Sequence, residues 1–222
     1  MFYQVIFKEK IIYTFYIILA TVFISLKGFK DQFFFNKYKF EVKSILNGEK
    51  IRMFSSGFLH VDYNHLALNL FTLYIFSDQV IGRVGAINYL IIYITSLYIG
   101  NYFSLKFHKK EPFYSAVGAS GAVTGIVYSS IILYPEMKLI MIFLPIPLPA
   151  YIFGIAYLLY SIYGMNKNLG NIGHTAHFGG AIAGLCMTIL FKPEIVDENL
   201  WIIILMISPI ILFMYNSKRK IF

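Results

Sequence analysis

Long charge-free stretches alternate with short charged segments along this chain. Seven such stretches lie between consecutive charged residues, at 11–26, 63–77, 84–105, 112–135, 139–166, 168–191 and 199–217. A helix needs about 20 residues to cross the hydrocarbon of a bilayer, with a range of about 17–25. The last five stretches are therefore long enough to span a membrane, and the first two are marginal.

Helices fit these stretches better than strands do. Peptide groups in lipid must be hydrogen-bonded within the protein, which only helices and closed barrels achieve. A barrel strand alternates apolar and polar residues, and no such alternation runs through the stretches. We therefore expect an all-α membrane protein, a polytopic helical bundle that forms one membrane domain over residues 1–222. The first stretch is expected to be a helix rather than a signal peptide, because it is longer than a usual signal core and no small-residue cleavage site follows Ala20.

The composition supports a membrane protein and excludes several enzyme classes. The chain is 58% hydrophobic and 14% charged, whereas soluble domains carry about 25% charged residues. The stretches contain no Asp, Glu, Lys or Arg, and a charge at a helix centre costs about 2.5–3.5 kcal/mol on insertion scales. An aspartyl intramembrane protease and a carboxylate proton relay are thereby excluded. The zinc-protease motif His-Glu-x-x-His is also missing.

The longest connection, residues 27–62, interleaves basic and aromatic side chains, most densely at 33–40. Such a pattern can indicate nucleic-acid binding, but between two spans it favours the headgroup region, with lysines reaching the aqueous side. The net charge of +8 then indicates affinity for anionic lipid, and no nucleic-acid partner is expected. The single cysteine, Cys186, cannot form an intramolecular disulfide and is expected to be buried in the packing.

A few polar residues remain within or beside the stretches: His60, His65, Asn69, Ser120, Thr124, His174 and His177. A single His or Asn at a helix entrance often only forms a hydrogen bond with a neighbouring backbone group. Taken one at a time, each of these residues could have that structural role. Metal binding is not expected, because His60 and His65 would lie on different faces of one continuous helix and no buried carboxylate completes a site. His65 and Asn69 are four apart and share a helix face.

Ser120 stands between small residues in the fourth stretch. Gly121 and Gly125 form a small-xxx-small face, which by itself indicates helix packing. The spacing differs from the Gly-x-Ser-x-Gly elbow of soluble hydrolases. A serine at a helix entrance nevertheless lies beside free amide groups and the positive end of the helix dipole, which stabilise an oxyanion. Acyl transfer requires that environment.

The sixth stretch carries a histidine above a glycine notch. His177, Gly180 and Gly184 fall on one helix face. If this notch packs against Gly121 and Gly125, the imidazole approaches Ser120. Cys186 falls on the opposite face, which argues against a Cys–His pair.

Three motifs in this order resemble the rhomboid intramembrane proteases: His65-x-x-x-Asn69, Gly118-Ala119-Ser120-Gly121 and Ala176-His177-x-x-Gly180. Residues 55–60, which precede the second stretch, are also similar to the family's approach to its active site. The resemblance covers residues 11–191 and implies a six-helix core. Residues 199–217 would add a seventh, C-terminal helix.

The resemblance implies an intramembrane serine endopeptidase that cleaves single-span membrane proteins. Ser120 would be the nucleophile and His177 the general base. Asn69, His65 and the loop at Gly118 would support the oxyanion. His60 and Arg52 would be structural, as would Gly121, Gly180 and Gly184. No cofactor or metal is implied, and the oligomeric state is left open. The alternative is a non-catalytic rhomboid-like protein that binds membrane clients, but such proteins typically lack the serine or the histidine.

Three positions depart from the family pattern. Thr124 stands where an aromatic residue usually packs on the histidine, Ile51 replaces the tryptophan before Arg52, and Ile81 replaces a glutamate. These departures concern how His177 is oriented and how the first loop is anchored. Residue bias further suggests a bacterial cytoplasmic membrane. We expect a cytoplasmic amino terminus and an active site open to the outside, although only five bases would then lie inside and fourteen outside.

Overall fold

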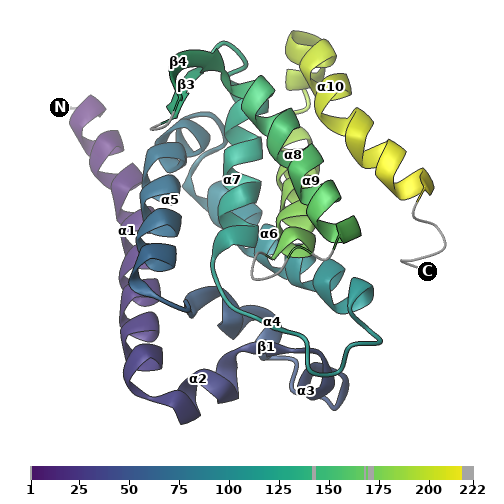
Figure 1. Cartoon of the computed structure of the whole chain (residues 1–222). Coiled ribbons are helices and arrows are strands. Elements are labelled where there is room, and N and C mark those ends of the chain that lie inside the picture. Colours follow the sequence, from purple (N-terminus) through teal and green to yellow (C-terminus); the bar gives the residue numbers. More distant parts are fainter. Residues whose placement is uncertain (1, 142–143, 168, 170–172, 217–222) are drawn as a thin grey trace.

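Seven long helices form the body of the protein (Figure 1). The structure is a computed structural model that describes residues 2–141, 144–167, 169 and 173–216. The long helices are α1 (Phe2–Lys30), α5 (Tyr63–Val84), α6 (Ala86–Phe107), α7 (Ser120–Leu133), α8 (Ala150–Lys167), α9 (His174–Phe191) and α10 (Ile195–Asn216). Within the described residues, length and composition alone qualify Ile12–Lys30, His174–Phe191 and Ile195–Tyr215 to cross a membrane. The predicted all-α membrane fold is confirmed.

The central helix α7 is shorter than predicted. Its 14 residues extend about 21 Å, less than the hydrocarbon thickness of about 30 Å, and every residue from Gly121 to Leu133 is buried. The stretch 112–135 was expected to be helical throughout. Instead β2 (Ser115–Ala116) pairs antiparallel with β1 (Phe40–Glu41), and Gly118 turns the chain at φ 130°. Ser120 therefore begins a helix deep within the bundle.

A second correction concerns the stretch 139–166, which was expected to be one helix. Its first part is a hairpin of β3 (Lys138–Met141) and β4 (Leu144–Pro149), and only then does α8 begin. Pro145, Pro147 and Pro149 alternate along β4. Proline removes a backbone donor and clashes with the preceding helical turn, so this segment cannot continue a helix.

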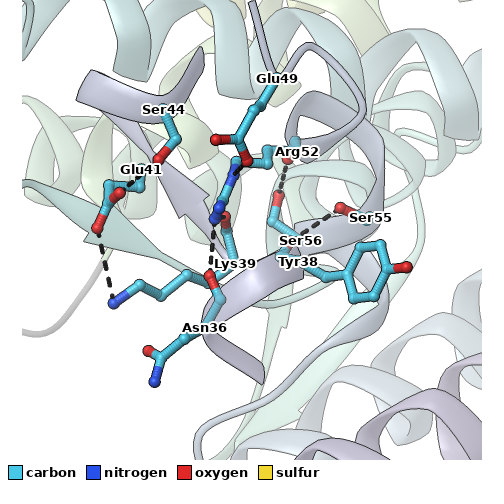
Figure 2. Close-up of polar contacts among 9 residues, drawn as sticks. All are labelled: Asn36, Tyr38, Lys39, Glu41, Ser44, Glu49, Arg52, Ser55 and Ser56. Atoms are coloured by element: carbon cyan, nitrogen blue, oxygen red, sulfur yellow. Dashed lines mark hydrogen bonds and ion pairs between the residues drawn. The ribbon is translucent and has the colours of Figure 1, made fainter. Parts of the chain in front are cut away.

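The connection after α1 folds into short helices, α2 (Gln32–Tyr38), α3 (Val42–Leu46), α4 (Arg52–Ser55) and the 3₁₀ turn η1 (Ser56–Phe58). Arg52 ties them together, as Figure 2 shows: its Nη1 donates to the carbonyls of Asn36 at 2.8 Å and Lys39 at 2.9 Å, and its Nε pairs with Glu49 at 2.8 Å. The guanidinium is buried, so these bonds replace its hydration. The expected anchoring of this loop by Arg52 thus has a specific set of partners.

The C-terminal helix α10 lies outside the bundle against α8, with Ile202 and Met206 buried (Figure 1). Its first turn is tied to the end of the bundle opposite Ser120: Glu198 pairs with Arg83 at 2.9 Å, and Asn199 Nδ2 donates to the Ile132 carbonyl at 3.1 Å.

One packing prediction is wrong. Cys186 lies on the exposed side of α9, because the glycine face of this helix turns toward α7 and its opposite face turns outward.

Candidate active site

Ser120 and His177 are hydrogen-bonded to each other. The Nε2 atom of His177 lies 2.7 Å from the Ser120 hydroxyl oxygen. Ser120 is the first residue of α7, and His177 lies one turn inside α9. The two side chains meet because α7 and α9 pack backbone to backbone below them: a Cβ atom at Gly180 or Gly184 would overlap the carbonyl of Gly121 or Gly125, respectively. The glycines therefore set the distance between nucleophile and base.

Both side chains line an open cavity of about 1190 Å³, whose wall is formed by α5, α6, α7, α8, α9 and nearby loops. Polar residues on its wall include His65, Asn69, Thr72 and Thr124. A polar wall at this depth is costly in a membrane protein unless water or a substrate occupies the space. The cavity therefore gives the dyad access to water.

The expected oxyanion residues face the same cavity. Asn69 is buried on α5 and its Nδ2 donates to the His65 carbonyl at 3.1 Å. The His65 ring stands over Gly118, where an added Cβ would lie 2.7 Å from His65 Cε1. Gly118 also has a positive φ, so a side chain there would be strained as well as crowded. The Ser120 amide, in the first turn of α7, has no intrahelical acceptor, and it makes no backbone hydrogen bond elsewhere in the described part of the chain.

His60 lies in the loop before α5, which corrects the expectation that His60 and His65 occupy one continuous helix. The helix begins at Tyr63, where the Asp62 carboxylate caps the His65 amide at 2.7 Å. The two histidine rings consequently meet edge to face, 4.8 Å apart.

The nitrogens of His60 connect α1 to the loop before Ser120. Its Nδ1 lies 2.9 Å from the Ser25 hydroxyl, which itself donates to the Phe58 carbonyl, and its Nε2 accepts from the Ala119 amide at 3.4 Å. Ser25 therefore receives the Nδ1–H. Burial lowers the pKa of His60 to about 3, so the ring is neutral. This is a supporting position for the nucleophile's loop.

Sequence reasoning missed Tyr157 of α8. Its hydroxyl lies 2.8 Å from Nδ1 of His177, the ring nitrogen that does not face Ser120, and the two ring centroids are 5.7 Å apart. The Tyr157 side chain also interacts with Thr124 of α7. Tyr157 stands in no recognisable motif, and its only signal was a hydroxyl within a charge-free stretch that also holds Tyr151, Tyr160 and Tyr163.

His174 begins α9 and lines the cavity, but it does not reach the dyad. Its ring packs edge to face on Tyr160 at 5.1 Å and lies 6.5 Å from the His177 ring. Neither ring nitrogen has a hydrogen-bond partner among the described residues.

The chain is similar in sequence to known proteins. The family model of the Rhomboid domain matches residues 47–194, which include α5 to α9, both residues of the dyad and the loop at Gly118. The chain is 28% identical over 155 residues to "Rhomboid protein 1, mitochondrial" of Saccharomyces cerevisiae, an alignment that covers 68% of this chain and 44% of the relative. It is 29% identical over 177 residues to "RHOMBOID-like protein 12, mitochondrial" of Arabidopsis thaliana, covering 73% and 52%.

A bacterial relative is also similar. "Putative rhomboid protease YdcA" of Bacillus subtilis is 32% identical over 93 residues, which are 40% of this chain and 45% of the relative. The chain thus spans about half the length of the curated relatives that it matches. Since the domain model covers well over half of the chain, the protein belongs to the rhomboid family.

Proposed function

We propose that this protein is an intramembrane serine endopeptidase that works through a Ser120–His177 dyad. The observation that carries the proposal is the 2.7 Å hydrogen bond between the Ser120 hydroxyl and His177 Nε2 at the wall of a large cavity that also exposes several polar side chains. In the reaction, Ser120 donates its proton to Nε2 as its oxygen attacks the scissile carbonyl. His177 then gives that proton to the leaving amine, and a water molecule repeats the sequence to release the acyl group from Ser120.

The negative charge that develops on the carbonyl oxygen would be stabilised by groups already oriented toward the cavity. These are the Ser120 amide at the start of α7 and the side chains of Asn69 and His65 on α5. Each such donor contributes about 2.7–4 kcal/mol in enzymes where one has been removed. The positive end of α7 acts in the same direction.

The shape of the cavity favours a membrane-spanning substrate. Its wall includes Leu68 of α5, whose side chain is 65% exposed on the outer surface of the bundle, and Phe153 of α8. The cavity thus extends from Ser120 to the lipid-facing surface between these two helices. An unwound segment of a single-span protein could reach the nucleophile along that path without crossing the protein.

A non-catalytic client-binding role is the alternative, and the hydrogen-bonded dyad disfavours it, because a binding protein has no need of an oriented serine and base. The bacterial cytoplasmic membrane stays a prediction from composition, since the relatives include mitochondrial proteins as well as a bacterial one.

The test uses the purified full chain in lipid vesicles with a single-span reporter protein. The wild type should cleave the reporter, whereas Ser120→Ala and His177→Ala should each abolish cleavage. The double variant should be no worse than either one, because the two residues act as a unit. A fluorophosphonate probe should label Ser120 in the wild type and fail in His177→Ala. A probe adduct on another serine, or cleavage by Ser120→Ala, would overturn the proposal.

A further inference from the structure

Among the described residues, no carboxylate is hydrogen-bonded to His177. In serine proteases with a triad, a buried carboxylate accepts the Nδ1–H of the histidine and fixes its orientation and tautomer. Here the group within hydrogen-bond distance of His177 Nδ1 is a neutral phenol, the Tyr157 hydroxyl, at 2.8 Å. Tyr157 comes from α8, a different helix from those that carry Ser120 and His177. Three helices therefore meet at the imidazole.

The tautomer of His177 decides whether Ser120 can be activated. If Nδ1 carries the hydrogen and donates it to Tyr157, the lone pair of Nε2 is free to accept the Ser120 proton. If Tyr157 instead donated to Nδ1, the hydrogen would sit on Nε2, which could then accept nothing from Ser120. Activity requires the first arrangement.

Thr124 favours that productive arrangement. It is buried on α7, lines the cavity beside Tyr157, and interacts with the tyrosine side chain. When the Thr124 hydroxyl oxygen accepts the Tyr157 O–H, the tyrosine lone pairs turn toward His177 Nδ1. The hydrogen bonds then run in one direction, from Ser120 to Nε2 and from Nδ1 through Tyr157 to Thr124.

We infer that Tyr157, oriented by Thr124, is the positioning residue that fixes the ring and tautomer of His177 in place of a carboxylate. The inference rests on the proposed function and adds two residues to it. When His177 takes up the serine proton, the Nδ1–H···Oη bond becomes charge-assisted and strengthens, so its contribution is greatest as the charge develops. Removing it should lower the catalytic rate and leave substrate binding intact.

The variant that tests this is Tyr157→Phe, which keeps the ring and deletes the hydroxyl. We expect kcat on the reporter to fall about tenfold or more, the rate equivalent of one hydrogen bond, with KM and thermal stability unchanged. Labelling of Ser120 by the fluorophosphonate should slow by a similar factor. Tyr163→Phe is the matched control, because Tyr163 lies on the exposed side of the same helix and should retain wild-type kinetics.

A conservative pair tests the role of Thr124. Thr124→Val removes the hydroxyl at nearly constant volume and should lower kcat severalfold. Thr124→Ser keeps the hydroxyl and should have a kcat close to that of the wild type. If Thr124 only filled space, the effect of each variant would depend on side-chain size instead. Both variants would then change the thermal stability of the protein.

A spectroscopic measurement gives an answer without catalysis. In the Ser120→Ala protein with ¹⁵N-labelled histidine, the Nδ1–H proton of His177 should resonate far downfield and be identified by its absence from His177→Ala. Tyr157→Phe should shift it upfield or abolish it. If this resonance is unchanged, or if Tyr157→Phe keeps the wild-type kcat while Ser120→Ala is inactive, the positioning inference is wrong and the proposed function stands. Cleavage by Ser120→Ala would instead defeat the proposed function itself.

Discussion

The backbone of Gly184 in α9 lies directly against the carbonyl of Gly125 in α7, so close that a Cβ at Gly184 would overlap it. The same relationship recurs one turn higher between Gly180 and Gly121. These backbone contacts hold the two helices at the distance at which Ser120 and His177 are hydrogen-bonded.

Substituting either notch glycine should separate the dyad. We expect Gly180→Leu and Gly184→Leu to reduce reporter cleavage at least about a hundredfold, because a misplacement of about 1 Å can cost that much in rate. The matched control is Cys186→Leu, which places the same leucine side chain on the exposed face of the same helix and should cleave normally. Wild-type cleavage by both glycine variants would show that the helix contact does not position the dyad.

Asn69→Ala should slow cleavage of the reporter but leave covalent labelling of Ser120 by the fluorophosphonate intact. The side chain of Asn69 lines the cavity but is not part of the Ser120–His177 hydrogen bond, so the nucleophile stays intact. We expect a fluorophosphonate adduct on Ser120 together with a loss of kcat of about 10²–10³, the usual effect of removing one oxyanion donor. Equal losses of labelling and cleavage would instead indicate that Asn69 supports the fold of the dyad.

The positions of the long helices could be read from the sequence because charge is excluded from lipid-embedded segments. The motif residues could be found because their spacing follows the helical period. Two features had no such signal. The proline-alternating hairpin carries one charge, Lys138 at its start, and is otherwise as free of charges as a span, while the Tyr157–His177 contact joins residues whose separation of 20 positions follows no helical repeat. Contacts between helices depend on packing, which a single sequence does not display.

His60 should make the protein less stable in acid. Its pKa is 6.5 when unfolded and about 3 in the folded protein because burial disfavours the charged ring. Below pH 6.5 the unfolded state takes up a proton that the folded state excludes, so stability falls as the pH drops from 6.5 toward 3.

The measurement is thermal unfolding in detergent as a function of pH. His60→Gln should unfold at a lower temperature than the wild type at pH 7.5, because it loses one of the two bonds to Ser25 and Ala119. Its curve should be flatter between pH 6.5 and 4, so that the two proteins converge. Parallel curves would mean that His60 does not titrate on unfolding.

The orientation of the protein in its membrane can be predicted from the two ends of the bundle. Lys50 and Lys110 lie at one end, because the β1–β2 pairing joins their two loops near the start of α7. Lys138 follows the far end of α7 and so lies at the other. The expectation that the Lys50 end is outside opposes the positive-inside rule, which would place the many bases of that end in the cytoplasm.

Several of those bases are held against aromatic rings of the protein. This weakens the charge-based argument that they belong on the cytoplasmic side. The Nζ atom of Lys27 lies 4.4 Å from the centre of the Phe34 ring, and Nζ of Lys43 lies 5.8 Å from that of Phe113. Exposed aromatic residues beside lysines favour a segment bound at the membrane interface. Reporter fusions at positions 50 and 110 should therefore read as outside and a fusion at 138 as inside. The inverse pattern would turn the molecule over and open the cavity of Ser120 to the cytoplasm.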